Sequence, residues 1–282
     1  IIALPVVIIL LLLTIAQGTT IAGANASRWI QVPLVGVTFQ TSTLAAVVLM
    51  TYVARYLSTI EGRIVTFKET LLPLWVPVFL VLALILPANF STAAIIFAMV
   101  SLLVFIGGYP LKYLAIILGA GLLMLSLFVV TAKAFPGVFP NRVDTWISRV
   151  ESFADKTDTE ANYQIDQAKI AIASGGITGL GPGKSVQKNF LPQSSSDFIY
   201  AIIVEEFGIV GALGIMIVYL MLLFRLVIVA HKSSDMFSKL LVIGVGLPIV
   251  FQALINMAVA VSLFPVTGQT LPLISSGGSS IW

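Results

Sequence analysis

A carboxylate stands where a polar stretch of this chain gives way to a long apolar one. Asp197 closes the polar segment 132–197, and the residues that follow, 198–224, are apolar enough to cross a bilayer as one helix. An ionisable group at such a boundary is a candidate functional residue, because partial desolvation of the charge needs a partner or a substrate to offset it. The alternative is a helix cap, since Asp before a helix accepts hydrogen bonds from the free amides of the first turn. The two roles are compatible.

Other polar residues lie inside apolar segments downstream. Glu205 and Glu206 come about two turns into the same predicted helix, where two adjacent carboxylates cannot both face lipid at low cost. Either one of them caps a polar cavity, or the pair bonds to backbone or to a neighbouring helix. Gln252 and Asn256 lie one turn apart on the next predicted helix, a spacing typical of hydrogen bonds between helices.

The glycine-rich stretch 175–185 ends in Lys184 and Ser185 and superficially resembles a phosphate-binding loop. The residues before it, 163–174, have the pattern of an amphipathic helix rather than the strand that such a loop requires, and the glycine spacing differs. Glycines still let backbone amides approach an anion, and Lys184 and Lys188 add positive charge. Pyrophosphate binding and plain turn formation are both open interpretations.

Two further sets of residues could bind a charged or hydroxyl-bearing ligand. Arg28 precedes Trp29 in a short loop, where Arg suits a phosphate, a carboxylate or a lipid headgroup, and Trp suits the membrane interface. Ser275, Ser276, Ser279 and Ser280 stand in the apolar stretch 271–282, where small hydroxyl residues suit close helix packing as well as a hydroxyl-lined cavity.

The elements that position these residues are expected to be membrane-spanning helices. Of the 282 residues, 59% are hydrophobic and 10% are charged, whereas soluble domains carry about 25% charged residues. Peptide groups in lipid must bond internally, and the apolar runs lack the alternation of barrel strands. We predict an all-α polytopic protein, one membrane domain over 1–282 with a large loop at 132–197, and about eight spans, located near 1–16, 38–56, 71–87, 91–107, 111–131, 198–224, 240–263 and 271–282.

Two details of this arrangement follow from single segments. The sequence at 87–91, Pro-Ala-Asn-Phe-Ser, predicts either a tight hairpin or a broken helix between two nearly continuous spans. Basic residues favour one side of the membrane, which the positive-inside rule makes cytoplasmic and which leaves the loop ending at Asp197 outside; they are Arg55, Arg63, Lys68, Lys112, Arg225, Lys232 and Lys239.

Composition excludes several classes of function. The net charge is +3 and the basic residues are spread over loops, so the sequence carries no nucleic-acid footprint. The chain has no Cys and a single His, His231, so neither a disulfide framework nor a thiolate or histidine metal cluster can form. The chain begins and stops inside apolar runs, and we therefore expect it to be a fragment of a longer protein.

A series of short motifs runs along the chain, at residues 23–29, 40–44, 87–92, Tyr163-Gln164, Gly175-Gly176, Leu191-Pro192, Asp197-Phe198-Ile199 and 265–280. In this order the motifs resemble the FtsW/RodA family, the peptidoglycan glycosyltransferases of shape, elongation, division and sporulation. The resemblance covers nearly the whole chain and implies a helical bundle of about ten spans, about eight of them present here.

The resemblance implies a reaction. A hydroxyl of one lipid II sugar would attack the anomeric carbon of another with inversion, and undecaprenyl pyrophosphate would leave. The acid of the Asp-Phe-Ile motif, Asp197 here, would be the general base. Arg28, with Lys184 or Lys188, would offset the charge of the pyrophosphate, and Gln164, Ser275 and Ser279 are further candidates for substrate binding. No cofactor is required by the motifs; a divalent cation such as Mg²⁺ is the one candidate.

The chain departs from the family pattern at Thr41, Thr43, Ala46 and Asn89, where Pro, Glu, Lys and Asp are usual. The missing Lys leaves the phosphate clamp incomplete, whereas Asp197 and Arg28 match. The motifs resemble the division branch more than the elongation branch. That resemblance implies a multi-pass protein of the bacterial inner membrane at the division septum, with a class B penicillin-binding protein, other divisome proteins and membrane lipids as partners.

Two other functions would suit the same helical bundle. A lipid II flippase would move the substrate across the membrane without forming a glycosidic bond, and it would tolerate Asp197→Asn if that residue only lines a path. A divisome scaffold would hold the penicillin-binding protein and would keep both complex formation and function after the same substitution.

Overall fold

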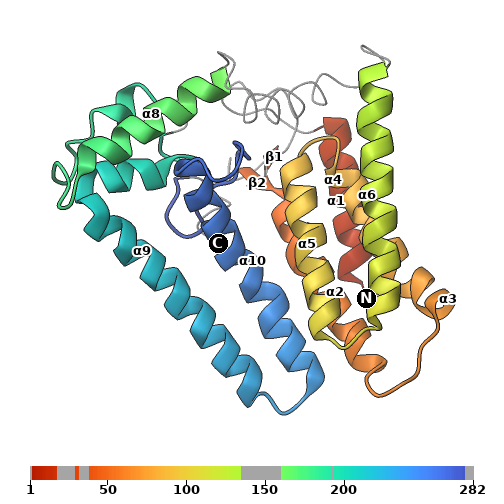
Figure 1. The fold of residues 1–282 in the computed structure, drawn as a ribbon. Helices are drawn as coiled ribbons and strands as arrows, with labels where there is room; N and C mark the ends of the chain where they lie inside the picture. Colours follow the sequence, from red (N-terminus) through yellow and green to blue (C-terminus); the bar gives the residue numbers. More distant parts are fainter. Residues whose placement is uncertain (1, 18–28, 32–37, 135–159, 192–193, 277–282) are drawn as a thin grey trace. The chain divides into compact units, whose positions relative to one another are not determined.

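The computed structural model describes residues 2–17, 29–31, 38–134, 160–191 and 194–276. These residues form helices joined by short turns, with one pair of three-residue strands (Figure 1). The elements are α1 (Ala3–Gln17), β1 (Trp29–Gln31), β2 (Thr38–Gln40), α2 (Thr41–Thr59), α3 (Phe67–Thr70), the π-turn η1 (Leu71–Trp75), α4 (Val76–Ile85), α5 (Phe90–Ile106), α6 (Leu111–Ala134), α8 (Glu160–Gly175), the 3-10 turn η2 (Gln187–Asn189), α9 (Ile199–Lys232) and α10 (Met236–Ala260).

The helical fold class is confirmed. Within the described residues, three helical stretches are long and apolar enough to cross a membrane, Phe67–Ile85, Ile199–Lys232 and Met236–Ala260. Three shorter apolar helices accompany them, Ala3–Ala16, Phe90–Ile106 and Leu111–Leu127. Contacts group the chain into two compact units, one of residues 1–145 and 226–248, the other of residues 146–225 and 249–282. The expectation of a single membrane domain stays a prediction.

The first unit is a helical bundle built around α2. Its buried side chains recur at a spacing of three and four residues, which places them on one helix face: Ala45, Leu49, Met50, Val53, Ala54 and Leu57. Helices α1, α4 and α5 pack against α2. The first half of α10 also packs there, because a Cβ at Gly244 would lie 3.0 Å from Leu103 of α5 and 3.4 Å from Met50 of α2.

The predicted span near 71–87 belongs to a helix made of α3, the π-helical segment η1 and α4 in succession. Pro73 lies in η1, where a proline cannot donate the regular helical hydrogen bond. The carbonyl of Pro73 accepts the hydroxyl hydrogen of Tyr52 from α2, so a side chain of the bundle stabilises the irregular turn. The next break is a tight hairpin: Asn89 caps α5 by accepting from the Thr92 amide at 3.2 Å, and α4 and α5 pack together.

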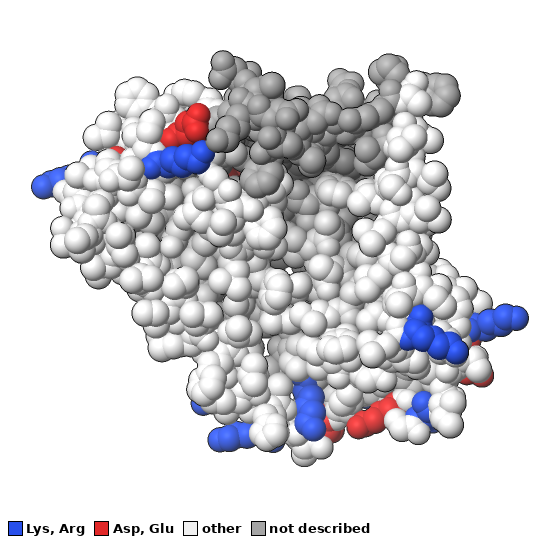
Figure 2. All heavy atoms as spheres, viewed as in Figure 1, with Lys and Arg blue, Asp and Glu red and all other residues white. Residues whose placement is uncertain are grey.

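Charged side chains of the first unit gather at the end formed by its short loops (Figure 2). These loops join α2 to α3, α5 to α6 and α9 to α10. Of the basic residues counted in the sequence, Arg63 lies in the first loop and the others lie on the helices that the loops connect. Arg55 lies over the ring of Phe237 at 5.6 Å, a cation–π contact between α2 and α10. The loop between α9 and α10 is only residues 233–235, because α9 continues to Lys232 and does not end near 224 as predicted.

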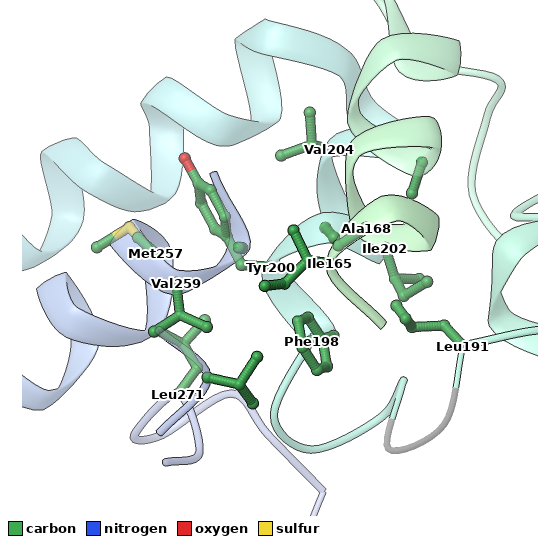
Figure 3. Packing of buried hydrophobic residues seen from close by; sticks show 14 of the residues in the cluster. Ile165, Ala168, Leu191, Phe198, Tyr200, Ile202, Val204, Met257, Val259 and Leu271 are labelled. Atoms are coloured by element: carbon green, nitrogen blue, oxygen red, sulfur yellow. The ribbon is translucent and has the colours of Figure 1, made fainter. Parts of the chain in front are cut away.

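The second unit holds α8, η2, most of α9 and the end of α10 around one apolar cluster (Figure 3). Ile165 and Ala168 of α8 meet Phe198 and Tyr200 at the start of α9, with Leu191 from the loop between them. Met257, Val259 and Leu271 complete the cluster from the C-terminal side. The amphipathic helix expected at 163–174 is confirmed as α8.

The chain after α10 turns back and does not form the last predicted span in its described part. Helix α10 ends in a Schellman motif, in which Leu263 N bonds Ala258 O at 2.8 Å and Ser262 takes a positive φ of 61°. Residues 271–276 form turns, so a span beginning at 271 is wrong for these residues. Leu273 has φ 67°, a left-handed conformation that a right-handed helix cannot contain.

Candidate functional site

Asp197 lies in a turn two residues before α9, at the mouth of an apolar helix as predicted. The residue is half-buried, and its neighbours fix it from both sides. Phe198, 1% exposed, anchors the chain in the apolar cluster (Figure 3), and burial of such a ring stabilises by roughly 1.5–3 kcal/mol. A helix-cap bond from the side chain of Asp197 stays a prediction.

The backbone before α9 is held by side chains from the C-terminal part of the chain. Three successive carbonyls each accept a hydrogen bond. Ser276 Oγ donates to Ser195 O at 2.9 Å, Ser275 Oγ donates to Ser196 O at 2.6 Å, and Asn256 Nδ2 donates to Asp197 O at 2.7 Å. The segment that carries Asp197 is therefore fixed by residues about 60–80 positions later in the chain.

The spacing of Gln252 and Asn256 predicted hydrogen bonds to another helix. This prediction is wrong, because both side-chain amides bond to backbone carbonyls outside the helices. Gln252 Nε2 donates to Thr270 O at 3.0 Å, and Asn256 Nδ2 donates to Gln269 O at 2.7 Å as well as to Asp197 O. Sequence spacing placed both amides on one helix face. It gave no signal that their acceptors are backbone carbonyls of turns, because any turn carbonyl can accept such a bond.

The glycine-rich stretch packs against a break in α9. Gly208 has φ 65° and ψ −164°, which interrupts the helix. Two amides of the stretch, those of Leu180 and Gly181, donate to the carbonyls of Glu205 and Glu206, both at 2.9 Å. In return, the amides of Ile209 and Val210 donate to carbonyls of residues 176 and 177, at 3.0 and 3.3 Å.

These reciprocal backbone hydrogen bonds bring the two segments so close that some of their positions have no room for a side chain. A Cβ at Gly179 would lie 2.1 Å from Glu206 O, and one at Gly208 would lie 2.2 Å from Ile177 O, so both positions require glycine. The amides of Leu180 and Gly181 are bonded within the protein. Turn formation is thus the interpretation that the described geometry supports for the centre of the stretch.

Glu205 is a buried carboxylate that accepts hydrogen bonds from the next loop. It is 1% exposed, and Ser185 Oγ, Val186 N and Gln187 N donate to it, the two amides at 3.1 and 3.3 Å. Glu206 accepts from Ser185 N at 3.4 Å. Of the two roles considered for this pair, bonding to backbone is the one observed, and both carboxylates hold the turn before η2.

The two predicted pyrophosphate ligands in this loop both contact its glycines. Lys184 and Lys188 are exposed, and Lys188 Nζ donates to Gly183 O at 2.9 Å. The Lys184 side chain lies over Gly181, 3.4 Å from the position of a Cβ there. Ser194 Oγ donates to Lys188 O at 3.1 Å, which ties this loop to the turn that contains Asp197.

The other predicted binding residues differ in what the structure describes. Gln164 is half-buried on α8, and Ser275 is fully buried, with its hydroxyl bonded to Ser196 O and to Leu271 N. Arg28 and Ser279 lie outside the described residues. In the part of the chain that the structure describes, no three His, Asp or Glu side chains gather as a metal site would require. Substrate binding by these residues stays a prediction.

Comparison with known proteins places the whole chain in one family. Residues 1–282 match the FtsW/RodA/SpoVE family, described as cell cycle proteins. A protein of Saccharophagus degradans named "Probable peptidoglycan glycosyltransferase FtsW" is 35% identical over 262 residues, which cover 91% of this chain and 65% of the relative. A protein of the same name from Geobacter sp. is 33% identical over 278 residues, covering 96% of this chain and 72% of the relative. The chain thus spans about two thirds of the length of these relatives.

Solved structures agree with this placement. A peptidoglycan synthase complex, described as coordinating polymerization and crosslinking, contains a chain of TM-score 0.73 and 28% identity, with 99% of this chain and 75% of that chain covered. The crystal structure of the rod shape determining protein RodA of Thermus thermophilus has TM-score 0.65 and 26% identity, with 99% and 72% covered.

Proposed function

The chain belongs to the FtsW/RodA/SpoVE family of cell cycle proteins, and from this premise we propose that it is a peptidoglycan glycosyltransferase that joins lipid II units into glycan strands. The observation that carries the proposal is Asp197, a half-buried acid in a turn fixed at the start of the apolar helix α9. Its motif, Asp-Phe-Ile, is the one that the family resemblance assigns to the catalytic acid.

Asp197 would act as the general base of an inverting transfer. The hydroxyl of one sugar attacks the anomeric carbon of another, and the bond from that carbon to the pyrophosphate oxygen breaks. The hydroxyl proton passes to the carboxylate, and the bonding electron pair leaves with undecaprenyl pyrophosphate. A base in this role needs hydrogen-bond reach to the hydroxyl, which favours a carboxylate on a fixed turn over one on a free loop.

The leaving pyrophosphate needs positive charge near it. Lys184 and Lys188 supply it in the proposal, together with Arg28, since preorganised charge where negative charge develops is usually a large part of catalysis. Gln164, Ser275 and Ser279 belong to the proposed substrate-binding set. A divalent cation such as Mg²⁺ enters only as a counter-ion held by the pyrophosphate, because Mg²⁺ usually binds substrate phosphates with few protein ligands.

The cellular setting is proposed on the same grounds. The relatives that carry the FtsW name favour a role in division, in the inner membrane at the septum. Lipid II and the membrane lipids are the small partners. A class B penicillin-binding protein, within the divisome, is the proposed protein partner; the similar peptidoglycan synthase complex, which couples polymerization to crosslinking, supports it.

The test is polymerisation of purified lipid II by the full-length protein with its penicillin-binding partner. Asp197→Asn should abolish polymer formation, because the amide cannot take the hydroxyl proton. Asp166→Asn, which changes an exposed acid of α8, is the matched control and should polymerise like wild type. Equal polymer from wild type and Asp197→Asn would remove Asp197 from catalysis. No polymer from wild type would favour transport or scaffolding instead.

A further inference from the structure

A hydrogen bond from Asn256 reaches the peptide group of Asp197 itself. Ser275 and Ser276 hold the carbonyls of the two preceding residues, whereas Asn256 Nδ2 donates to Asp197 O at 2.7 Å. The same nitrogen donates to Gln269 O, also at 2.7 Å. Asn256 therefore joins the turn before α9 to the segment after α10 through one NH₂ group.

The orientation of this amide is fixed by its acceptors. Both acceptors are carbonyl oxygens, so the group that faces them must be the NH₂, because the reversed amide would set three oxygens against one another. The side chain is 1% exposed. Its Oδ1 is buried and has no hydrogen-bond partner among the described residues.

The unpaired Oδ1 argues against a role in packing alone. A buried acceptor without a donor destabilises the fold relative to an apolar side chain of similar size. The unpaired Oδ1 offsets part of the stability that the side chain adds, so the favourable contribution of Asn256 comes from the two hydrogen bonds of its NH₂ group. One of these two bonds restrains the backbone of Asp197, the proposed general base.

We propose that Asn256 is a positioning residue for Asp197: its NH₂ group fixes the Asp197 peptide and with it the point from which the carboxylate extends. This inference rests on the proposed function of Asp197 as general base. A general base works only within hydrogen-bond reach of the hydroxyl, and a misplacement of about 1 Å can lower the rate roughly 100-fold. Loss of the restraint should therefore lower kcat more than it raises KM.

Helix α10 provides a matched control one turn away. Gln252 donates to Thr270 O and to the Thr270 hydroxyl oxygen, in the same C-terminal segment and next to Gln269. Asn256→Asp and Gln252→Glu are both isosteric, and both remove an amide donor from a backbone carbonyl of the segment after α10, Gln269 O in the first variant and Thr270 O in the second. Only Asn256→Asp also removes the bond to Asp197 O.

The experiment compares both variants with wild type in lipid II polymerisation, using the full-length protein with its penicillin-binding partner. Asn256→Asp should lower kcat about 10- to 100-fold with KM changed less than about threefold, whereas Gln252→Glu should stay within about threefold in both constants. If either acidic variant does not fold, Asn256→Ser and Gln252→Ser give the same comparison, judged at matched thermal midpoint and complex yield. Equal kcat for the two positions would overturn the proposal.

A second readout does not depend on activity. Hydrogen–deuterium exchange of the peptide covering residues 194–202 should quicken in Asn256→Asp and stay at the wild-type rate in Gln252→Glu. Equal exchange in both variants would show that Asn256 does not restrain this turn and would overturn positioning even in an active enzyme. An inactive wild type with faster exchange only in Asn256→Asp would refute the polymerase function while supporting the restraint.

Discussion

The carboxylate of Glu205 accepts the hydroxyl hydrogen of Ser185, a residue twenty positions earlier in the chain. The bond lies in the protein interior, and the amides of Val186 and Gln187 donate to the same carboxylate. Glu205 therefore connects the body of α9 to the turn before η2. That turn lies between the two lysines that we propose as pyrophosphate ligands.

Replacing Glu205 with Ala should destabilise the protein strongly. The change leaves one hydroxyl and two amides without an acceptor in a buried place, and the expected loss is about 3 kcal/mol. The control is Glu206→Ala, because Glu206 is half-buried and accepts a single amide at 3.4 Å; we expect less than about 1 kcal/mol there. Thermal unfolding of both variants in detergent is the measurement, and similar midpoints would contradict this account of Glu205.

A second prediction concerns two glycines of α9. Gly208→Ala should destabilise by about 2 kcal/mol or more, because φ is positive and the new Cβ would meet Ile177 O at 2.2 Å. Gly214 has helical neighbours, and a Cβ there meets nothing within 4 Å. Gly214→Ala should therefore be neutral or stabilise by up to about 1 kcal/mol. Chemical denaturation of both variants would test the break, and a neutral Gly208→Ala would argue against it.

The break at Gly208 also shows where sequence patterns stop being informative. Apolar length predicted α9 and α10, because a helix is the one open structure that satisfies its peptide groups in lipid. The interruption at Gly208 could not be predicted, since no proline marks it and its stabilising bonds come from residues 176–181. Local sequence favours a continuous helix, and tertiary hydrogen bonds override that preference.

The candidate site was predictable to a similar degree. The position of Asp197 before an apolar run was visible in the sequence, and the structure places it in a turn at that point. The bonds that fix it were not visible, because Asn256 and Ser275 are separated from it by 59 or more residues and act on backbone carbonyls. The span predicted at 271–282 was wrong over 271–276 for a related reason: the serine hydroxyls there bond to the turn before α9.

A pH dependence is expected at the start of α10. Asp235 accepts from the Ser238 amide at 2.9 Å, and this bond holds the pKa of the Asp235 carboxyl below its ordinary value of 3.8. Asp235 thus caps the start of α10. Because its pKa is lower in the folded than in the unfolded protein, the cap contributes its full stability above pH 3.8. This contribution is lost as the pH falls through the lowered pKa of the folded state. Asp235→Ala should lower the thermal midpoint at pH 7, and the difference from wild type should shrink as the pH drops below 4. A difference that is constant down to the lowest pH tolerated would exclude this cap.

The last prediction tests the two lysines of the glycine-rich loop. Lys184 and Lys188 are both exposed and both lie over residues 181–183. Because both side chains are exposed, they should act on the pyrophosphate through charge and should be screened by salt. The double variant Lys184→Ala/Lys188→Ala should raise KM for lipid II by about tenfold at low ionic strength, with a smaller effect at 0.5 M salt, where the screening length is only about 4 Å. Lys169→Ala, which removes an exposed charge paired with Asp166 on α8, should leave KM unchanged. An unchanged KM in the double variant would show that the lysines do not bind the substrate. The loop would then serve only to stabilise the break in α9, which it does through backbone hydrogen bonds that need no lysine.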